Sequence, residues 1–220
     1  MLIKNIEIRA CKHTQPVMKN SEMRDGKKSD LEFLVITFET DEGLSASTFG
    51  FAGRGAAMAG EIANTIFKPF FLGRDPLYRE KHWHDYRMAD RWWNHAPIYS
   101  YGPFDINCWL LSSMEAGQPL YKYLGAYRDK VPIYGSSLVH DKPDSYAKEA
   151  VEYKKKGFNA YKLHPPGKYD FDLEAHIKTR EAVGNNFKLM SDPVAPYTFE
   201  QALRFGRELE KLNYYWYEEP

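Results

Sequence analysis

The stretch GFNAYKLH, residues 157–164, decides the fold of this chain. A helical pattern over 143–156 stops at Gly157, and the apolar and aromatic residues that follow predict a short strand. The same alternation continues on both sides of this stretch. Strands are expected at 131–137, 158–164, 187–192 and 214–219, and helices at 143–156, 170–183 and 198–212, the last with a capping-box spacing at Thr198 and Gln201. Four strands with three intervening helices predict parallel β-α-β units.

These units can be completed in two ways. A full (β/α)₈ barrel needs ~250 residues, whereas the segment from 131 to 220 is much shorter. An open four-stranded sheet would suit this length. We favour a barrel interrupted after its fourth strand, because that arrangement fits the chemistry of the strand ends.

Residues 1–130 follow another pattern, with strands first and helices after them. Alternating apolar residues predict strands at 6–10, 33–38 and 44–49. Between and after these, a polar loop is expected at 12–29 and a glycine-rich loop at 50–55. Helices are expected at 56–71, 77–94 and 104–114. This order predicts an α+β domain over 1–130, followed by half a barrel over 131–220.

Composition narrows the choice of partners. The 30 basic and 30 acidic side chains cancel, which gives no reason to expect a nucleic acid or an anionic membrane as a partner. Cys11 and Cys108 have no metal-type spacing, and two cysteines make no disulfide framework, so a reducing, cytoplasmic location is expected. The first residues lack the apolar run of a signal peptide, and no stretch approaches the ~18 apolar residues of a membrane span.

Ionisable residues end three successive predicted strands. Lys162 and His164 lie two positions apart and therefore share one face of their strand. Asp192 ends the next strand, and Glu218 ends the one after it. Parallel strands present their C-terminal ends at the same edge, which is where active sites form in barrels. We therefore expect the four side chains to meet in one cavity.

These residue types together favour metal-assisted proton abstraction. Two carboxylates are hard oxygen ligands suited to Mg²⁺, and lysine and histidine carry protons near neutral pH. A metal that neutralises charge on a substrate carboxylate lowers the cost of an enediolate, while the base removes the α-proton. Any one of the four could equally be a surface lysine, a turn aspartate or a solvated glutamate. The arrival of all four at one sheet edge argues against that interpretation.

Four motifs, in order along the chain, resemble those of the enolase superfamily in its mandelate racemase and muconate lactonizing enzyme branch. They are GQPLYKYLG at 117–125, VPIY at 131–134, GFNAYKLH at 157–164 and YEEP at 217–220. The resemblance spans essentially the whole chain. It implies an α+β capping domain over 1–130 that selects the substrate. It further implies that 131–220 is the first half of a catalytic (β/α)₇β barrel.

The resemblance also implies roles for the site residues. Asp192 and Glu218 would be the first two of three carboxylate ligands of Mg²⁺. Lys162 and His164 would serve proton abstraction, with Lys162 as the charged neighbour of His164. Ser137, at the end of the first barrel strand, would contact the substrate carboxylate.

Substrate choice would fall to the capping-domain loops, at 13–30 and 51–55. Arg54 in the second loop could grip a distal carboxylate of the substrate, although a Gly-Arg-Gly turn exposed to water is the plainer interpretation.

The chain departs from the family pattern in three ways. His164 stands where the family carries a second lysine, and Asp192 is followed by Pro193-Val194 instead of Asp-x-Asn. The third metal ligand and the base of the opposite face are not in the sequence. Because a half barrel would expose apolar strand faces and two sheet edges, we expect a piece of a chain of ~350–400 residues.

Three functions are in competition. The first is an acid-sugar dehydratase, a homo-oligomer that acts on a small carboxylate substrate and removes its β-hydroxyl after proton abstraction. The second is a racemase, epimerase or cycloisomerase of the same superfamily. The third is a non-catalytic, truncated module for binding or oligomerisation.

Overall fold

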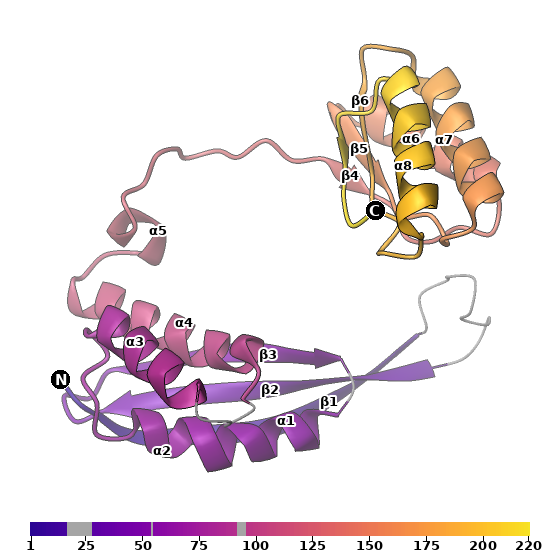
Figure 1. The fold of residues 1–220 in the computed structure, drawn as a ribbon. Helices are drawn as coiled ribbons and strands as arrows, with labels where there is room; N and C mark the ends of the chain where they lie inside the picture. Colours follow the sequence, from indigo (N-terminus) through magenta and orange to yellow (C-terminus); the bar gives the residue numbers. More distant parts are fainter. Residues whose placement is uncertain (17–27, 54, 92–95) are drawn as a thin grey trace. The chain divides into compact units, whose positions relative to one another are not determined.

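The structure, a computed structural model, describes residues 1–16, 28–53, 55–91 and 96–220 (Figure 1). The chain divides into two compact units. The N-terminal unit is built on Met1–Gln15 and Ser29–Asp129, and the C-terminal unit is built on Lys130–Pro220.

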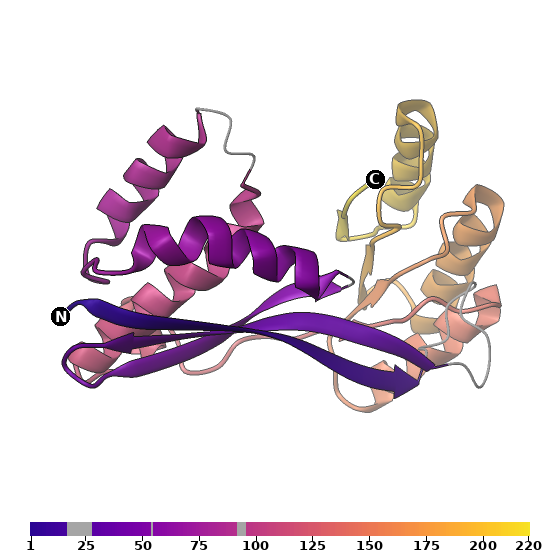
Figure 2. The ribbon, with the colours of Figure 1, turned by 90° about the horizontal axis from the view of Figure 1, so that it is seen from below.

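A three-stranded sheet forms one layer of the N-terminal unit, and its first two strands make a long twisted ribbon (Figure 2). The strands are β1 (Ile3–Pro16), β2 (Lys28–Thr40) and β3 (Ser45–Gly53), in the order β1-β2-β3. β2 and β3 pair antiparallel, and Gly43, at φ 88°, supplies a left-handed residue in their turn.

β1 continues to Pro16, through residues that the sequence predicted to be a polar loop. Polar contacts to β2 support this part of the strand. The Lys12 ammonium lies 2.5 Å from one carboxylate oxygen of Asp30, and the Thr14 hydroxyl donates to the other at 2.7 Å. Such cross-strand pairs stabilise a strand without an apolar pattern. The predicted strand therefore ended too early, because the prediction used apolar periodicity alone.

Helices follow the sheet and supply an aromatic core. They are α1 (Ala56–Ile62), the π-helical η1 (Ala63–Phe67), α2 (Lys68–Phe71), α3 (Arg79–Asp90), α4 (Ile98–Glu115) and α5 (Leu120–Tyr123). Phe38 of β2 packs against Phe71 and Phe104, with ring centroids 5.7 Å apart in both pairs. All three rings are fully buried, so the sheet and the helices share one hydrophobic core.

α4 begins at Ile98, earlier than the expected start at 104. The helix contains Pro103, and a proline inside a helix removes one backbone hydrogen bond. The carbonyl that loses this bond belongs to Tyr99, which is 80% exposed, so water can replace the missing donor.

The expected glycine-rich loop at 50–55 is wrong for 50–53, which belong to β3. Gly50 lies so close to α4 that a Cβ atom there would meet Cγ of Pro103 at 3.1 Å. Glycine therefore serves the close packing of a strand on a helix at this position, and not a turn.

Four parallel strands form the sheet of the C-terminal unit. They are β4 (Gly135–Ser136), β5 (Ala160–Leu163), β6 (Lys188–Ser191) and β7 (Trp216–Tyr217), in the order β4-β5-β6-β7. The helices between them are α6 (Pro143–Lys155), α7 (Tyr169–Val183) and α8 (Phe199–Lys211). The spatial order repeats the chain order without reversal, as in a barrel and unlike a doubly wound sheet.

The predicted capping box at the start of α8 is confirmed. The Thr198 hydroxyl accepts from the Gln201 backbone N–H at 3.4 Å, and the Gln201 side chain accepts from the Thr198 N–H at 3.1 Å. Two N–H groups that the first helical turn leaves unpaired are satisfied in this way.

One face of the parallel sheet packs against the helices. Tyr161, Leu163 and Leu189 are fully buried there, together with Ala150 of α6 and Ala175 of α7. Because side chains alternate along a strand, the residues between them face the opposite side. The helix-covered face is therefore the hydrophobic core of the unit, and the other face is open.

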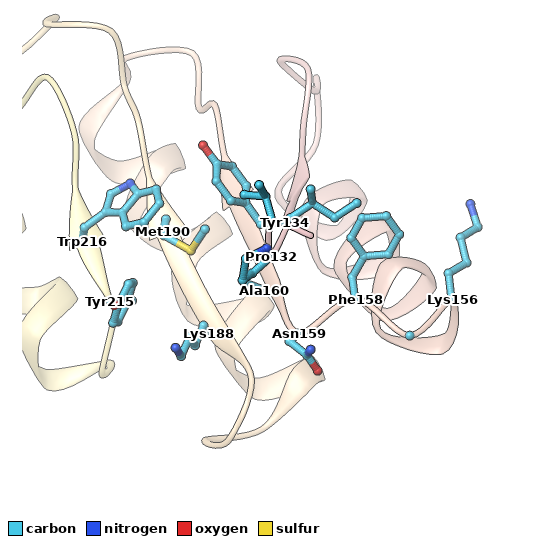
Figure 3. Close-up of a pocket in the computed structure, with 13 residues that line it drawn as sticks. Pro132, Tyr134, Lys156, Phe158, Asn159, Ala160, Lys188, Met190, Tyr215 and Trp216 are labelled. Carbon is cyan, nitrogen blue, oxygen red and sulfur yellow. The ribbon is translucent and has the colours of Figure 1, made fainter. Parts of the chain in front are cut away.

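The open face is hollowed and largely apolar (Figure 3). Tyr134, Met190 and Trp216 line it toward the beginning of the strands. β4 is shorter than the predicted strand at 131–137, and Val131 and Ile133 lie outside the sheet at 70% and 69% exposure. Among the residues that the structure describes, no helix combines the length and apolar content needed to cross a bilayer.

Candidate active site

Each parallel strand is followed at once by a polar residue. Ser137 follows β4, His164 follows β5, Asp192 follows β6 and Glu218 follows β7. The strand register pairs Leu163 with Ser191 across β5 and β6, and Ser191 with Tyr217 across β6 and β7. The three ionisable residues therefore form the next row, at the C-terminal edge of the sheet.

Lys162 lies at the centre of a carboxylate pair. Its ammonium donates to Oδ2 of Asp192 and to Oε2 of Glu218, at 2.9 Å in both cases. The two carboxylate oxygens are thus no farther apart than twice that distance. The Lys162 and Asp192 side chains are each 9% exposed, and that of Glu218 is 43% exposed. The predicted acid pair is therefore close enough to share one cation.

The ammonium and the Asp192 carboxylate stabilise one another's charge. Burial lowers the pKa of Lys162, but its hydrogen bonds to the two carboxylates outweigh burial and leave that pKa above its ordinary value. Burial raises the pKa of Asp192, but the hydrogen bond from Lys162 and the positive charge around the carboxylate together outweigh burial, so that pKa lies below its ordinary value.

His164 joins the same cluster from the other side of Asp192. Its Nε2 lies 2.9 Å from Oδ2 of Asp192, and its Nδ1 lies 2.7 Å from the carbonyl oxygen of Ser137. A carbonyl oxygen only accepts, so the contact to Ser137 requires a proton on Nδ1. The imidazole is thereby fixed in position and orientation.

Ser137, the predicted substrate contact, is only 3% exposed. Its hydroxyl accepts from the backbone N–H of His164 at 2.8 Å. It thus supports the end of β5, and its contact with a substrate stays a prediction. Arg54 and residues 17–27 of the predicted capping loops lie outside the described residues.

The two metal ligands predicted from the sequence, Asp192 and Glu218, lie together in this cluster. Within the described ranges of the chain, no group of three His, Cys, Asp or Glu side chains forms a metal-binding set. Asp192 and Glu218 are nevertheless hard oxygen donors that converge on one positive charge. The donor pair fits Mg²⁺, which is usually bound through one or two carboxylates and keeps several water molecules.

A second polar cluster lies behind β6 and was missed from the sequence. The buried His176 of α7 contacts the Ser191 hydroxyl with Nε2 at 2.8 Å and the Asp172 carbonyl oxygen with Nδ1 at 2.5 Å. The Asp172 carboxylate accepts from the Tyr197 hydroxyl. Asp172 and His176 lie four residues apart on α7, a spacing typical of any amphipathic helix, so the sequence held no separate signal for this cluster.

Because of this cluster, we expect the free energy of unfolding of the protein to depend on pH. Burial raises the pKa of Asp172 to about 6, against ~3.9 in an unfolded chain. The folded protein therefore binds this proton more tightly, and its free energy of unfolding should fall by up to about 3 kcal/mol as pH rises from about 4 to about 6. Denaturant unfolding of the wild type and of Asp172→Asn across this range measures the effect.

The comparison of the two proteins isolates Asp172. Burial lowers the pKa of His176 to about 4, which gives a trend of opposite sign in the same pH range. The wild-type curve minus the Asp172→Asn curve removes that trend. Parallel curves would show that Asp172 ionises as easily in the folded protein as in the unfolded chain.

Known proteins similar to this chain belong to one superfamily of enzymes. Residues 145–220 match the sequence model of the family described as Enolase C-terminal domain-like. L-talarate/galactarate dehydratase of Salmonella typhimurium is 29% identical over 87% of this chain and 50% of its own length. Hydrophobic dipeptide epimerase of Enterococcus faecalis is 30% identical over 93% of this chain and 57% of its own length.

A solved structure agrees with these matches. D-glucarate dehydratase from Agrobacterium tumefaciens, complexed with magnesium, has a TM-score of 0.86 and 30% identity, and the match covers 100% of this chain and 61% of that one. Residues 145–220 thus match the enolase C-terminal-like family. The predicted resemblance to the enolase superfamily and the predicted fold class, with the first four strands of a TIM-like barrel, are confirmed. The chain spans about half the length of the curated relatives it matches.

Proposed function

We propose that this chain is part of a Mg²⁺-dependent lyase that abstracts the proton next to a carboxylate and eliminates water from an acid sugar. The cluster of Lys162, His164, Asp192 and Glu218 at the C-terminal ends of β5, β6 and β7 carries the proposal. It combines a cation-binding carboxylate pair with two proton carriers, and this reaction needs both.

Asp192 and Glu218 would hold the metal ion. Their oxygens already share one cation, the Lys162 ammonium, and the exposed side chain of Glu218 leaves room for further ligands. When bound, Mg²⁺ would neutralise the negative charge that develops on the substrate carboxylate.

His164 is the more accessible of the two proton carriers. Its side chain is 26% exposed, against 9% for Lys162, so a substrate can approach it. Its ring is held by Ser137 and Asp192, which fixes the direction in which Nε2 points. Lys162 neutralises part of the negative charge of the acid pair. We therefore assign the base to His164 and the charged neighbour to Lys162.

The overall reaction is the loss of one water. The electron pair of the broken Cα–H bond forms a double bond as the β-hydroxyl leaves with a proton. The enol that results tautomerises to a 2-keto-3-deoxy acid. The substrate class is supported by relatives that are named as dehydratases of talarate, galactarate and arabinonate.

A screen of mono- and diacid sugars tests this function. The full-length protein is incubated with each acid and Mg²⁺, and 2-keto acid is measured as its semicarbazone. We expect one or a few acids to react, and an excess of chelator to stop the reaction. No 2-keto acid from any member would reject the dehydratase assignment.

Epimerisation is the second candidate, because the dipeptide epimerase of Enterococcus faecalis matches 93% of this chain. The same screen should therefore include dipeptides, in D₂O. Deuterium at the α-carbon with inversion and without keto acid would favour an epimerase over a dehydratase.

A further inference from the structure

A chain of hydroxyl groups runs behind the candidate base, on the helix-covered side of β4 and β5. The backbone N–H of His164 donates to the Ser137 hydroxyl at 2.8 Å, and the Ser137 side chain also interacts with the Tyr161 hydroxyl. Tyr161 in turn donates to Oε2 of Glu149 on α6, at 2.6 Å. His140 Nε2 contacts the same carboxylate oxygen at 2.7 Å.

The direction of these bonds is fixed by the donors available. The Ser137 hydroxyl accepts from His164, so its single proton is free to go to the Tyr161 oxygen. The Tyr161 proton then goes to the Glu149 carboxylate, which can only accept. Burial raises the pKa of Glu149, but the hydrogen bonds from His140 and Tyr161 outweigh burial and leave that pKa below its ordinary value. Glu149 is thus the ionised end of the chain.

A second tyrosine holds the other side of the His164 backbone. The Tyr146 hydroxyl donates to the His164 carbonyl oxygen at 2.8 Å and accepts from the His140 backbone N–H at 2.9 Å. Tyr146 and Tyr161 are both 0% exposed. Their hydroxyls therefore have no access to water, and each depends on these partners.

The location of this network in the fold indicates that it positions His164. The pairing of β4 with β5 ends at Ser136 and Lys162, so His164 lies beyond that ladder. Pro165 and Pro166 follow, and neither has an N–H to continue a ladder. The N–H and the carbonyl of His164 are held instead by Ser137 and Tyr146, and its ring by the Ser137 carbonyl.

We propose that Tyr161 and Tyr146 are positioning residues for His164, and that Tyr161 acts through Ser137 with Glu149 as its anchor. The proposal rests on the proposed role of His164 as the base. Without either hydroxyl the protein still contains His164, but the orientation of the His164 ring should be less well fixed. The loss should appear in turnover and not in substrate binding.

Tyr161→Phe and Tyr214→Phe in the full-length protein form a matched pair. Both variants remove one tyrosine hydroxyl from the C-terminal unit. The Tyr214 hydroxyl donates to the His176 carbonyl oxygen at 3.0 Å, away from His164. Thermal unfolding of both variants checks that each is folded.

The first readout does not need activity. In protein with ¹⁵N-labelled histidine, the proton on Nδ1 of His164 should give a slowly exchanging NMR signal, because it is bonded to the Ser137 carbonyl. His164→Gln assigns the signal by its loss. We expect the signal to broaden or exchange faster in Tyr161→Phe and to stay unchanged in Tyr214→Phe.

The second readout is the separate effect on kcat and on KM, measured with the substrate that the screen identifies. Tyr161→Phe should lower kcat on the order of 10-fold or more with KM nearly unchanged, as for other groups that orient a catalytic histidine. Tyr214→Phe should keep both constants. If Tyr161→Phe does not fold, Tyr146→Phe should give the same signature. Equal NMR and kinetic behaviour of the Tyr161 and Tyr214 variants would overturn the positioning role. An altered signal in a protein that turns over no acid would instead reject the proposed function alone.

Discussion

Asp192→Asn is expected to lower Mg²⁺-dependent turnover by at least about 100-fold in the full-length protein, since even groups outside the ligand sphere cost 10- to 100-fold. The amide of Asn keeps the size of the side chain but removes the negative charge that would bind the cation. The Asp192 carboxylate also contacts both Lys162 and His164, so its loss affects the metal site and both proton carriers. Glu218→Gln should act in the same direction.

Metal binding gives an independent measure of this prediction. A protein whose folded state binds Mg²⁺ gains thermal stability as the ion is added. The melting temperature of the wild type should rise with Mg²⁺, whereas that of Asp192→Asn should not. Asp144→Asn is the matched control, because Asp144 is a surface residue that pairs with Lys178 on the neighbouring helix. Asp192→Asn with wild-type turnover and a wild-type response to Mg²⁺ would dismiss the metal assignment.

The strand ends of the C-terminal unit could be predicted because two signals agree there. Helical segments with clear ends divide this part of the chain, and alternation within each short strand sets the faces. The structure ends β5, β6 and β7 at Leu163, Ser191 and Tyr217. The predicted residues His164, Asp192 and Glu218 each come one position later. The convergence of the site therefore follows from parallel topology and local pattern alone.

The features that the sequence missed depend on contacts between distant segments. Gly50 was assigned to a loop because nothing near it in the sequence reveals Pro103, which packs against it. Tyr161 lies within the predicted strand at 158–164 and alternates with Lys162. Its ring is buried, but the partner of its hydroxyl, Glu149, lies on another element, α6. The two-residue periodicity of a strand determines on which face of the sheet a side chain lies. It does not indicate which polar group that side chain contacts.

The second large effect is expected for His164→Ala, which should stop the exchange of the substrate α-proton with D₂O. General bases contribute typically 10²- to 10⁴-fold to such a step, so exchange should fall by about that factor. Deuterium incorporation into the substrate, followed by ¹H NMR, measures it. His84→Ala is the control, because His84 is an exposed histidine of α3.

Lys162 is the alternative base, and the two variants together separate the roles. Lys162 donates to both carboxylates and is 9% exposed, whereas His164 is 26% exposed. The geometry therefore predicts that His164→Ala loses exchange while Lys162→Met mainly disturbs the acid pair and its affinity for Mg²⁺. Because Lys162→Met removes a positive charge that competes with the metal ion, this variant should keep part of its exchange even at low Mg²⁺, and His164→Ala should show none at any Mg²⁺ concentration. Unchanged exchange in His164→Ala, with exchange lost in Lys162→Met at every Mg²⁺ concentration, would move the base to Lys162.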